Sequence, residues 1–213
     1  MSRIHLALLA TCALLSTTLE PDFSAFDASS QREALGLAAA DESPLATADD
    51  EALVAHITSR LALRRTSLSG TERRTLAETI VREAHAQGLA PHLVAAVIEV
   101  ESAGHHRAVS HVGALGLMQI LPATGRELAA KHGVPWSGPE TLFDPQINVK
   151  LGVAYLRELT NRYGDVSLAL AAYNWGPAVI DRRLRDGDKL PSEYIDSVMR
   201  AFVRDPAQAT RPS

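Results

Sequence analysis

The spacing of the apolar residues constrains the fold of this chain most strongly, because it follows a helical period and is interrupted at glycine and proline. From Thr71 to Gln87, apolar side chains recur every three or four residues. Gly88 then favours a left-handed stop, and Pro91 suits the first turn of a following helix. No alternating pattern typical of a β-strand continues for a convincing length. The sequence therefore predicts a mostly α-helical domain over about residues 70–205.

Three further helices are predicted towards the C-terminus. One has Asp144 as its N-cap and Pro145 in its first turn. The next starts at Asp165 and breaks at Gly176-Pro177, and the last lies in the stretch LPSEYIDSVMRAFV. Residues 206–213, beyond this helix, are predicted to form a tail.

The N-terminal residues have the pattern of an export signal. Arg3 precedes an apolar run from Leu6 to Leu15, which is too short to span a bilayer comfortably. We interpret residues 1–25 as a signal peptide without a fixed cleavage site and expect export to the periplasm or cell envelope. A short membrane anchor or a buried helix is the alternative. Cys12, the only cysteine, follows a stretch that loosely resembles a lipoprotein box, so lipidation there is a minor alternative.

Residues 26–69 are predicted to be a flexible lead-in, because the chain up to about residue 50 is rich in Ala, Ser, Asp and Glu. Apolar residues at helical spacing between residues 51 and 65 predict one short amphipathic helix within it, whose docking surface the sequence does not identify.

Charge and length limit the classes of partner. The 213 residues carry a formal net charge of −4 and no basic stripe, which disfavours nucleic acid. The length fits one domain with a sizeable core plus an extra tail, and we expect a monomer.

Two glutamates interrupt the apolar stretch AAVIEVESAGHH. Glu101 continues the apolar stripe of Val97 and Ile98, whereas Glu99 lies about 200° around the helix from it, beside His92. Burial beside apolar side chains would raise the pKa of Glu101 and keep it protonated near neutrality, as a general acid requires. The alternative is an acid at a helix end that simply reaches water.

The stretch SHVGALGLMQILPAT places Gly113 and Gly116 around an apolar turn that ends in Gln119, and Pro122 opens another helix. Glycines there permit close approach of the backbone to a ligand, or they merely let a loop cross a helix.

Together these segments resemble the soluble lytic transglycosylases, whose SLT catalytic domain is similar to goose-type lysozyme and to glycoside hydrolase family 23. The resemblance follows the family order over about residues 70–200. The matching residues are Glu101-Ser102, Gly113-Ala114, Gly116-Leu117-Met118-Gln119, Pro122, Thr124, Asn148, Gly152, Tyr155-Leu156, Ala172-Tyr173-Asn174, Gly176-Pro177 and Tyr194.

The resemblance implies a lysozyme-like helical fold and a role for each matching site residue. Glu101 would be the catalytic acid and base, and the hydroxyl of Tyr194 would point at it. Tyr155 is either a packing residue or part of the site. The residues expected to line the sugar cleft or lie beside it are Ser102, Met118, Gln119, Tyr173, Asn174 and Trp175.

The resemblance also implies an activity. Glu101 would cleave the MurNAc-GlcNAc β-1,4 bond of bacterial peptidoglycan and leave 1,6-anhydro-MurNAc ends, without a cofactor. Usual glycosidases need two carboxylates, and no second one stands in a matching motif. A lysozyme-type hydrolase and a catalytically silent peptidoglycan-binding or assembly protein are the alternatives. The expected partners are glycan strands and, beyond them, a secretion or wall-remodelling complex of the cell envelope.

Two positions depart from the family pattern. Gly104 stands where the family usually has an aromatic residue, which leaves the helix end less packed or lets His105 supply a ring. Trp175 replaces a small residue, and its ring is either a platform for a sugar or a filler beneath the loop.

Other enzyme classes find less support in the sequence. His105, His106 and His111 lack a His-Glu-x-x-His motif or a cysteine pair, so we interpret them as solvated loop residues and expect no metal. A serine hydrolase is disfavoured because no G-x-S-x-G stretch occurs.

Overall fold

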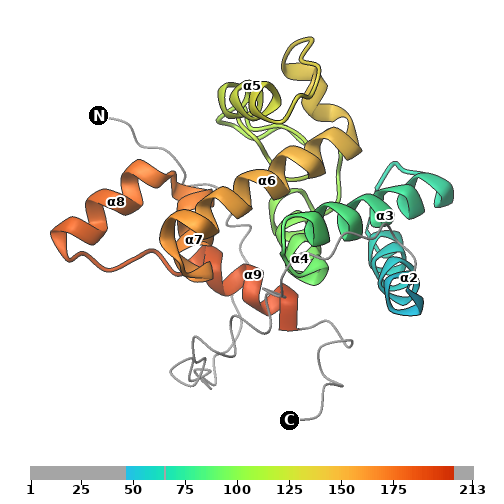
Figure 1. The fold of residues 1–213 in the computed structure, drawn as a ribbon, viewed down its shortest axis with the longest axis horizontal. Coiled ribbons are helices and arrows are strands. Elements are labelled where there is room, and N and C mark those ends of the chain that lie inside the picture. The colour runs from blue at the N-terminus through green and yellow to red at the C-terminus, as the bar shows by residue number, and fades with distance from the viewer. Residues whose placement is uncertain (1–46, 65, 204–213) are drawn as a thin grey trace.

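The computed structural model describes residues 47–64 and 66–203, and apart from two isolated β-bridges its regular elements there are helices (Figure 1). These are α2 (Ala48–Ala62), α3 (Gly70–Ala86), α4 (Pro91–Ser102), α5 (Pro122–Lys131), the 3-10 helix η2 (Pro139–Phe143), α6 (Pro145–Tyr163), α7 (Val166–Trp175), α8 (Pro177–Asp186) and α9 (Glu193–Val203). The predicted mostly α-helical fold is confirmed. The predicted signal peptide, Cys12 and the tail lie outside the described residues. No helix in the described ranges is both long and apolar enough to cross a membrane.

The predicted helix boundaries follow from local capping. The Asp144 carboxylate accepts hydrogen bonds at 2.9 Å from the backbone nitrogens of Gln146 and Ile147, which satisfies free N–H groups at the start of α6. Asp165 caps α7 in the same way, through the backbone nitrogen of Leu168 at 2.8 Å. Because these contacts span only two or three residues, the sequence alone is enough to predict them.

Helix α4 contributes heavily to the core and packs against α2, α3 and α9 (Figure 1). Most of its side chains are buried, including Leu93, Val94, Val97 and Ile98. A charged residue on such a helix must find a partner or change its protonation state.

Helix α2 packs on α3 and α4, and its side chains Val54, Ile57 and Leu61 are buried in the main core. The helix was predicted, but its packing was not. The folded unit therefore begins before residue 70, and the described part of the lead-in predicted at 26–69 contributes to it.

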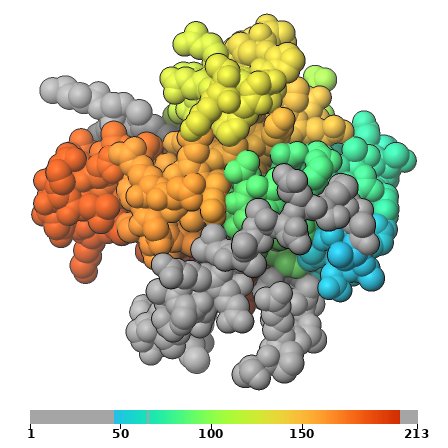
Figure 2. Space-filling model, viewed as in Figure 1, coloured from blue at the N-terminus to red at the C-terminus, as the bar shows by residue number. Residues whose placement is uncertain are grey.

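Helix α8 was not predicted, because Gly176-Pro177 was interpreted only as a break. Proline is equally suited to the first turn of a new helix, and α8 begins there. Only Ile180 of α8 is buried, and Asp181 ties the helix to α6 through Arg162 at 2.6 Å and the hydroxyl of Tyr163 at 2.9 Å. It projects at the opposite end of the molecule from α2 (Figure 2).

Candidate active site

Glu101 lies in the last turn of α4, partly exposed, where α4 packs against α9. The hydroxyl of Tyr194 on α9 donates a hydrogen bond to its Oε1 at 2.6 Å, the contact that the resemblance implied. Burial raises the pKa of Glu101 to about 7, and the hydrogen bond from Tyr194 opposes that rise. Near neutral pH this carboxyl group therefore exists in both protonation states, so it can donate a proton and later accept one.

Tyr173 on α7 lies near this carboxyl group and holds the adjacent loop. Burial and the negative charge of Glu101 raise its pKa well above the usual range. Its hydroxyl donates to the backbone oxygen of Met118 at 2.8 Å. The ring of Tyr155 packs against that of Tyr173, with centroids 5.4 Å apart. Tyr155 was expected to be either a packing residue or part of the site, and this contact is that of a packing residue.

Asn148 of α6 holds the loop before α5 in place. Its side chain is fully buried and accepts from the backbone nitrogen of Met118 at 2.8 Å. It also donates to the backbone oxygens of Leu115 at 3.0 Å and Leu142 at 2.8 Å. Gly116 has φ 78° and lies directly against Asn148 and the Leu142 oxygen, where a side chain would collide. Gly116 thus allows the loop to approach α6 closely, which matches the alternative that the glycines let a loop cross a helix.

Gln119 adopts a backbone conformation that non-glycine residues rarely take, with φ 49°. Its side-chain nitrogen donates to the backbone oxygens of Gly116 at 2.8 Å and Ala108 at 3.3 Å. Strained residues of this kind concentrate at functional sites, which fits the predicted place of Gln119 at the cleft.

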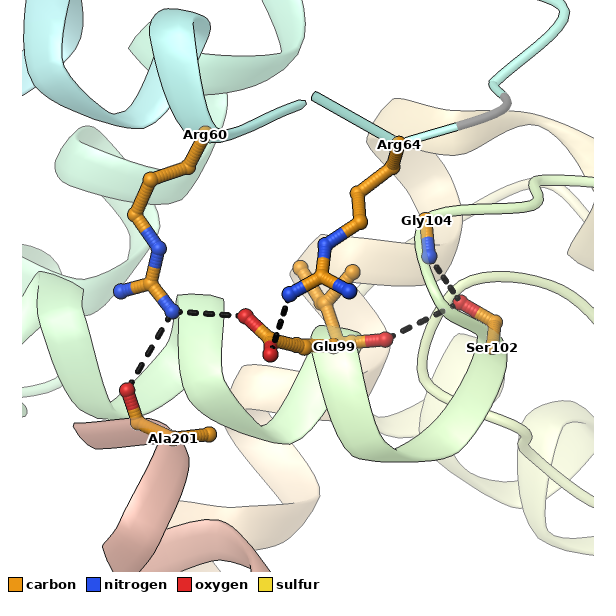
Figure 3. Close-up of polar contacts among 7 residues, drawn as sticks. Arg60, Arg64, Glu99, Ser102, Gly104 and Ala201 are labelled. Carbon is orange, nitrogen blue, oxygen red and sulfur yellow. Dashed lines mark hydrogen bonds and ion pairs between the residues drawn. The ribbon is translucent and has the colours of Figure 1, made fainter. Parts of the chain in front are cut away.

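Ser102 and Met118 are directed inwards. The Ser102 hydroxyl donates to the backbone oxygen of Ile98 at 3.1 Å and accepts from the nitrogen of Gly104 at 3.2 Å (Figure 3). Met118 is fully buried, and its sulfur packs against Gly152. Their contacts are those of a helix cap and of core packing, and the place beside the sugar cleft predicted for these two residues stays a prediction.

Asn174 and Trp175 are both partly exposed at the end of α7. The Trp175 ring packs against the apolar cluster that includes Ile180, and the guanidinium carbon of Arg183 lies 6.0 Å from its centroid. These contacts match the filler alternative for Trp175 more closely than the sugar platform.

The space beside Gly104 is filled by the end of α2. Gly104 has φ 83°, and a β-carbon placed there would lie 3.0 Å from Thr66 Cγ2 and 3.8 Å from a methyl group of Leu61. His105 is exposed, so it does not supply the missing ring. Both expectations for Gly104 are therefore wrong, since the helix end is covered by residues from a different helix and its following segment.

Glu99 points to the other side of α4, where Arg60 and Arg64 of the α2 region bind it (Figure 3). Arg60 Nη2 lies 2.7 Å from Glu99 Oε2, and Arg64 pairs with the other oxygen. Burial raises the pKa of Glu99, but the two arginines outweigh it and the pKa is lowered overall. Sequence analysis missed these arginines, although their spacing of four places both on one face of a helix.

Among residues 47–64 and 66–203, no cluster of three or more His, Cys, Asp or Glu side chains could hold a metal ion.

Comparison with known proteins identifies the family. The family model described as Transglycosylase SLT domain matches residues 78–195, more than half of the chain, so the protein belongs to this family. A transglycosylase of Enterobacteria phage PRD1 is 44% identical over 99 residues, which are 46% of this chain and 34% of that protein. The soluble lytic murein transglycosylase of Escherichia coli K12 is 38% identical over 119 residues, or 54% of this chain and 18% of that protein.

Two solved structures are also similar. The lytic transglycosylase Slt of Pseudomonas aeruginosa, solved as an inactive E503Q mutant in that enzyme's own numbering, aligns with a TM-score of 0.56 and 32% identity, covering 63% of this chain and 24% of that one. The 70-kDa soluble lytic transglycosylase of Escherichia coli gives a TM-score of 0.57 at 20% identity and covers 76% of this chain and 31% of that one. Because the identity is this low, the match supports the fold alone. The chain thus spans about a third or less of the length of these relatives.

Proposed function

We propose that this protein is a peptidoglycan lytic transglycosylase. It cleaves the β-1,4 bond between MurNAc and GlcNAc without adding water and leaves 1,6-anhydro-MurNAc ends. Membership of the SLT family and the names of the relatives support this activity. The observation that carries the proposal is the Glu101 carboxyl group, whose pKa of about 7 suits alternate donation and acceptance of a proton.

In the proposed reaction, protonated Glu101 donates its proton to the glycosidic oxygen, and the bond from that oxygen to the anomeric carbon of MurNAc breaks. The N-acetyl group of the same sugar stabilises the cation that forms. The Glu101 carboxylate then takes the proton of the MurNAc 6-hydroxyl group while that oxygen bonds to the anomeric carbon. Glu101 ends protonated, and no water is consumed.

The surroundings of Glu101 favour this route over a two-carboxylate mechanism. In the described part of the chain, burial raises the pKa of Glu101, the hydrogen bond from Tyr194 opposes the rise, and no second carboxylate is among the causes of the shift. The nearby Glu99 is occupied by two arginines on another side of α4. Retaining and inverting glycosidases usually place a second carboxylate about 5 to 9.5 Å from the acid, so that it can act as nucleophile or base.

The proposal extends to the cleft and the setting of the enzyme. Gln119, Tyr173 and Asn174 would contact the sugars, whereas Trp175 would border the cleft as a platform or support it from behind. The substrate would be the glycan strands of the cell wall, reached after export to the periplasm or envelope. The enzyme would act as a monomer, alone or within a secretion or wall-remodelling complex.

The test is to digest purified peptidoglycan with the full chain and measure the masses of the products. We expect muropeptides that are lighter by one water than lysozyme products and lack a reducing end. Reducing-end products as the main species would support the lysozyme-type hydrolase instead. Binding to peptidoglycan without any cleavage would support the catalytically silent protein.

A further inference from the structure

The side chain of Arg60 joins three helices at one point (Figure 3). From α2, its Nη2 donates to Glu99 Oε2 on α4 at 2.7 Å and to the backbone oxygen of Ala201 on α9 at 3.3 Å. The side chains of Arg60 and Glu99 are only 19% and 14% exposed. Charge-assisted hydrogen bonds shielded in this way are stronger than those at an open surface.

The same pair of helices carries the catalytic contact. Glu101 follows Glu99 on α4, and Tyr194 lies two turns before Ala201 on α9. The hydrogen bond from Tyr194 to Glu101, at 2.6 Å, therefore depends on how α9 lies against α4. The two helices pack together, and both contribute buried apolar residues to the main core, among them Val97 and Val198. Apolar burial is non-directional, so it fixes the relative position of two helices less sharply than hydrogen bonds do.

We propose that Arg60 is a positioning residue. By binding α4 through Glu99 and α9 through Ala201, it holds the Tyr194 hydroxyl at hydrogen-bond distance from Glu101. Helix α2, which lies before the region matched by the family model, is then part of the catalytic unit. This inference rests on the proposed function, but the contact it concerns can be measured without cleavage.

The chain offers two matched control residues. Arg64 binds the same glutamate, but in the described part of the chain no hydrogen bond or ion pair joins its guanidinium group to α9. Arg74 pairs with Glu51 of α2 at 2.6 Å and Glu78 of α3 at 2.9 Å, so its ion pairs involve neither α4 nor α9. Replacing each arginine by methionine removes one positive charge and keeps a long side chain.

The first readout is the pKa of Glu101 in the full chain, measured by NMR of its carboxyl carbon. The titratable groups that face Glu101 are Tyr194 of α9 and Tyr173 of α7. Because the Tyr194 hydrogen bond opposes the rise in this pKa, Arg60→Met should raise it further, in the same direction as Tyr194→Phe. Arg64→Met controls for the lost charge and should move it less, and Arg74→Met should leave it unchanged.

The second readout is a double-mutant cycle. If Arg60 acts through Tyr194, Arg60→Met should change the pKa of Glu101 little once Tyr194→Phe is present. In cleavage of soluble glycan fragments, Arg60→Met should lower kcat about tenfold with little change in KM, because it disturbs the catalytic geometry rather than substrate contacts. Arg60→Lys, which keeps a cation with several N–H donors, should restore most of the loss.

Equal pKa values in Arg60→Met and Arg64→Met, or fully additive effects of Arg60→Met and Tyr194→Phe, would overturn the proposal. So would a lower melting temperature with kcat of the folded fraction unchanged. Should Arg60→Met not fold, Glu99→Gln takes its place, because it weakens the contact between Arg60 and Glu99 from the side of α4. It is combined with Tyr194→Phe in the same double-mutant cycle, and additive effects on the pKa of Glu101 again contradict the proposal. A wild-type protein that cleaves no peptidoglycan refutes the proposed function, whereas the NMR titration still decides the role of Arg60.

Discussion

The two sides of helix α4 hold the same type of side chain in opposite electrostatic states. Glu99 lies between two arginines, which lower its pKa, whereas burial raises the pKa of Glu101 to about 7 and the contact with Tyr194 only moderates the rise. The two residues are separated by a single position in the chain. The difference shows that the surrounding helices, rather than the residue type, determine which glutamate can serve as an acid.

The comparison also separates two uses of a charged group. Glu99 connects α4 to the α2 region and, through Arg60, to α9. Glu101 makes no comparable ion pair in the described part of the chain, so its negative form is disfavoured in the folded protein. Glu99 thus connects neighbouring helices, whereas the proposed function gives Glu101 the task of keeping a proton available for chemistry.

The largest expected difference between the two sides is in activity. Glu101→Gln preserves size but removes the ionisable group, so peptidoglycan cleavage should fall by at least ~100-fold, as is typical for loss of a general acid and base. Glu99→Gln should lower it by no more than about tenfold, since it acts on positioning alone. Rates of release of soluble muropeptides give the comparison. Equal losses in the two variants would mean that the assignment of roles is wrong.

The second difference is in the dependence of stability on pH. The folded pKa of Glu101, about 7, is above its ordinary value of 4.5, so its contribution favours folding at low pH and is lost as the pH rises from about 4.5 through 7. Glu101→Gln should therefore stabilise the protein at pH 8, on the order of 2–3 kcal/mol, and have little effect at pH 4.

Glu99 should show the opposite dependence. Its pKa is lowered, so its stabilising contribution is present above the ordinary value and is lost as the pH falls through the folded pKa. Glu99→Gln should thus destabilise the protein at pH 8. Urea unfolding of both variants at the two pH values measures these changes, and a Glu101→Gln variant that is less stable than the wild type at pH 8 would contradict the environment assigned to Glu101.

The sequence was sufficient to predict one side of α4 and not the other. The environment of Glu101 follows from the helical period of Val97 and Ile98, which is a local property. The contact between Arg60 and Glu99 joins residues 39 positions apart, and nothing in the local pattern pairs them. Periodicity likewise indicated that α2 would form, but its docking depends on α3 and α4.

The same distinction applies to the site residues taken from the family resemblance. The contact that the resemblance implied for Tyr194 agrees with the structure, because its hydroxyl group donates a hydrogen bond to the carboxylate of Glu101. Ser102 and Met118 lie near the site in sequence, but their side chains turn inwards to backbone and core partners. A motif gives the neighbourhood of a residue, whereas the direction of its side chain depends on the packing around it.

Tyr194→Phe should have an intermediate effect. Loss of its hydrogen bond should raise the pKa of Glu101, so the fall of kcat/KM at alkaline pH should move to higher pH. The maximal rate should drop about tenfold, because the carboxyl group is less well oriented. In Tyr173→Phe, whose lost hydroxyl binds Met118 rather than Glu101, the alkaline fall should stay where it is in the wild type. A downward shift in Tyr194→Phe would show that the tyrosine does not stabilise the carboxylate.

The smallest expected effect tests how closely the α2 region covers α4. Gly104→Ala forces a β-carbon into the left-handed region at φ 83° and to within 3.0 Å of Thr66 Cγ2. Gly113→Ala is the matched control, since its φ of 80° is nearly the same but no heavy atom lies within 4 Å of the added carbon. Both substitutions should cost about 1 kcal/mol of unfolding free energy from backbone strain. Gly104→Ala should lose several tenths of a kcal/mol more, because the Thr66 segment must move away. Urea unfolding of the two variants gives the difference directly, and equal losses would mean that the segment after α2 yields freely and does not press on the end of α4.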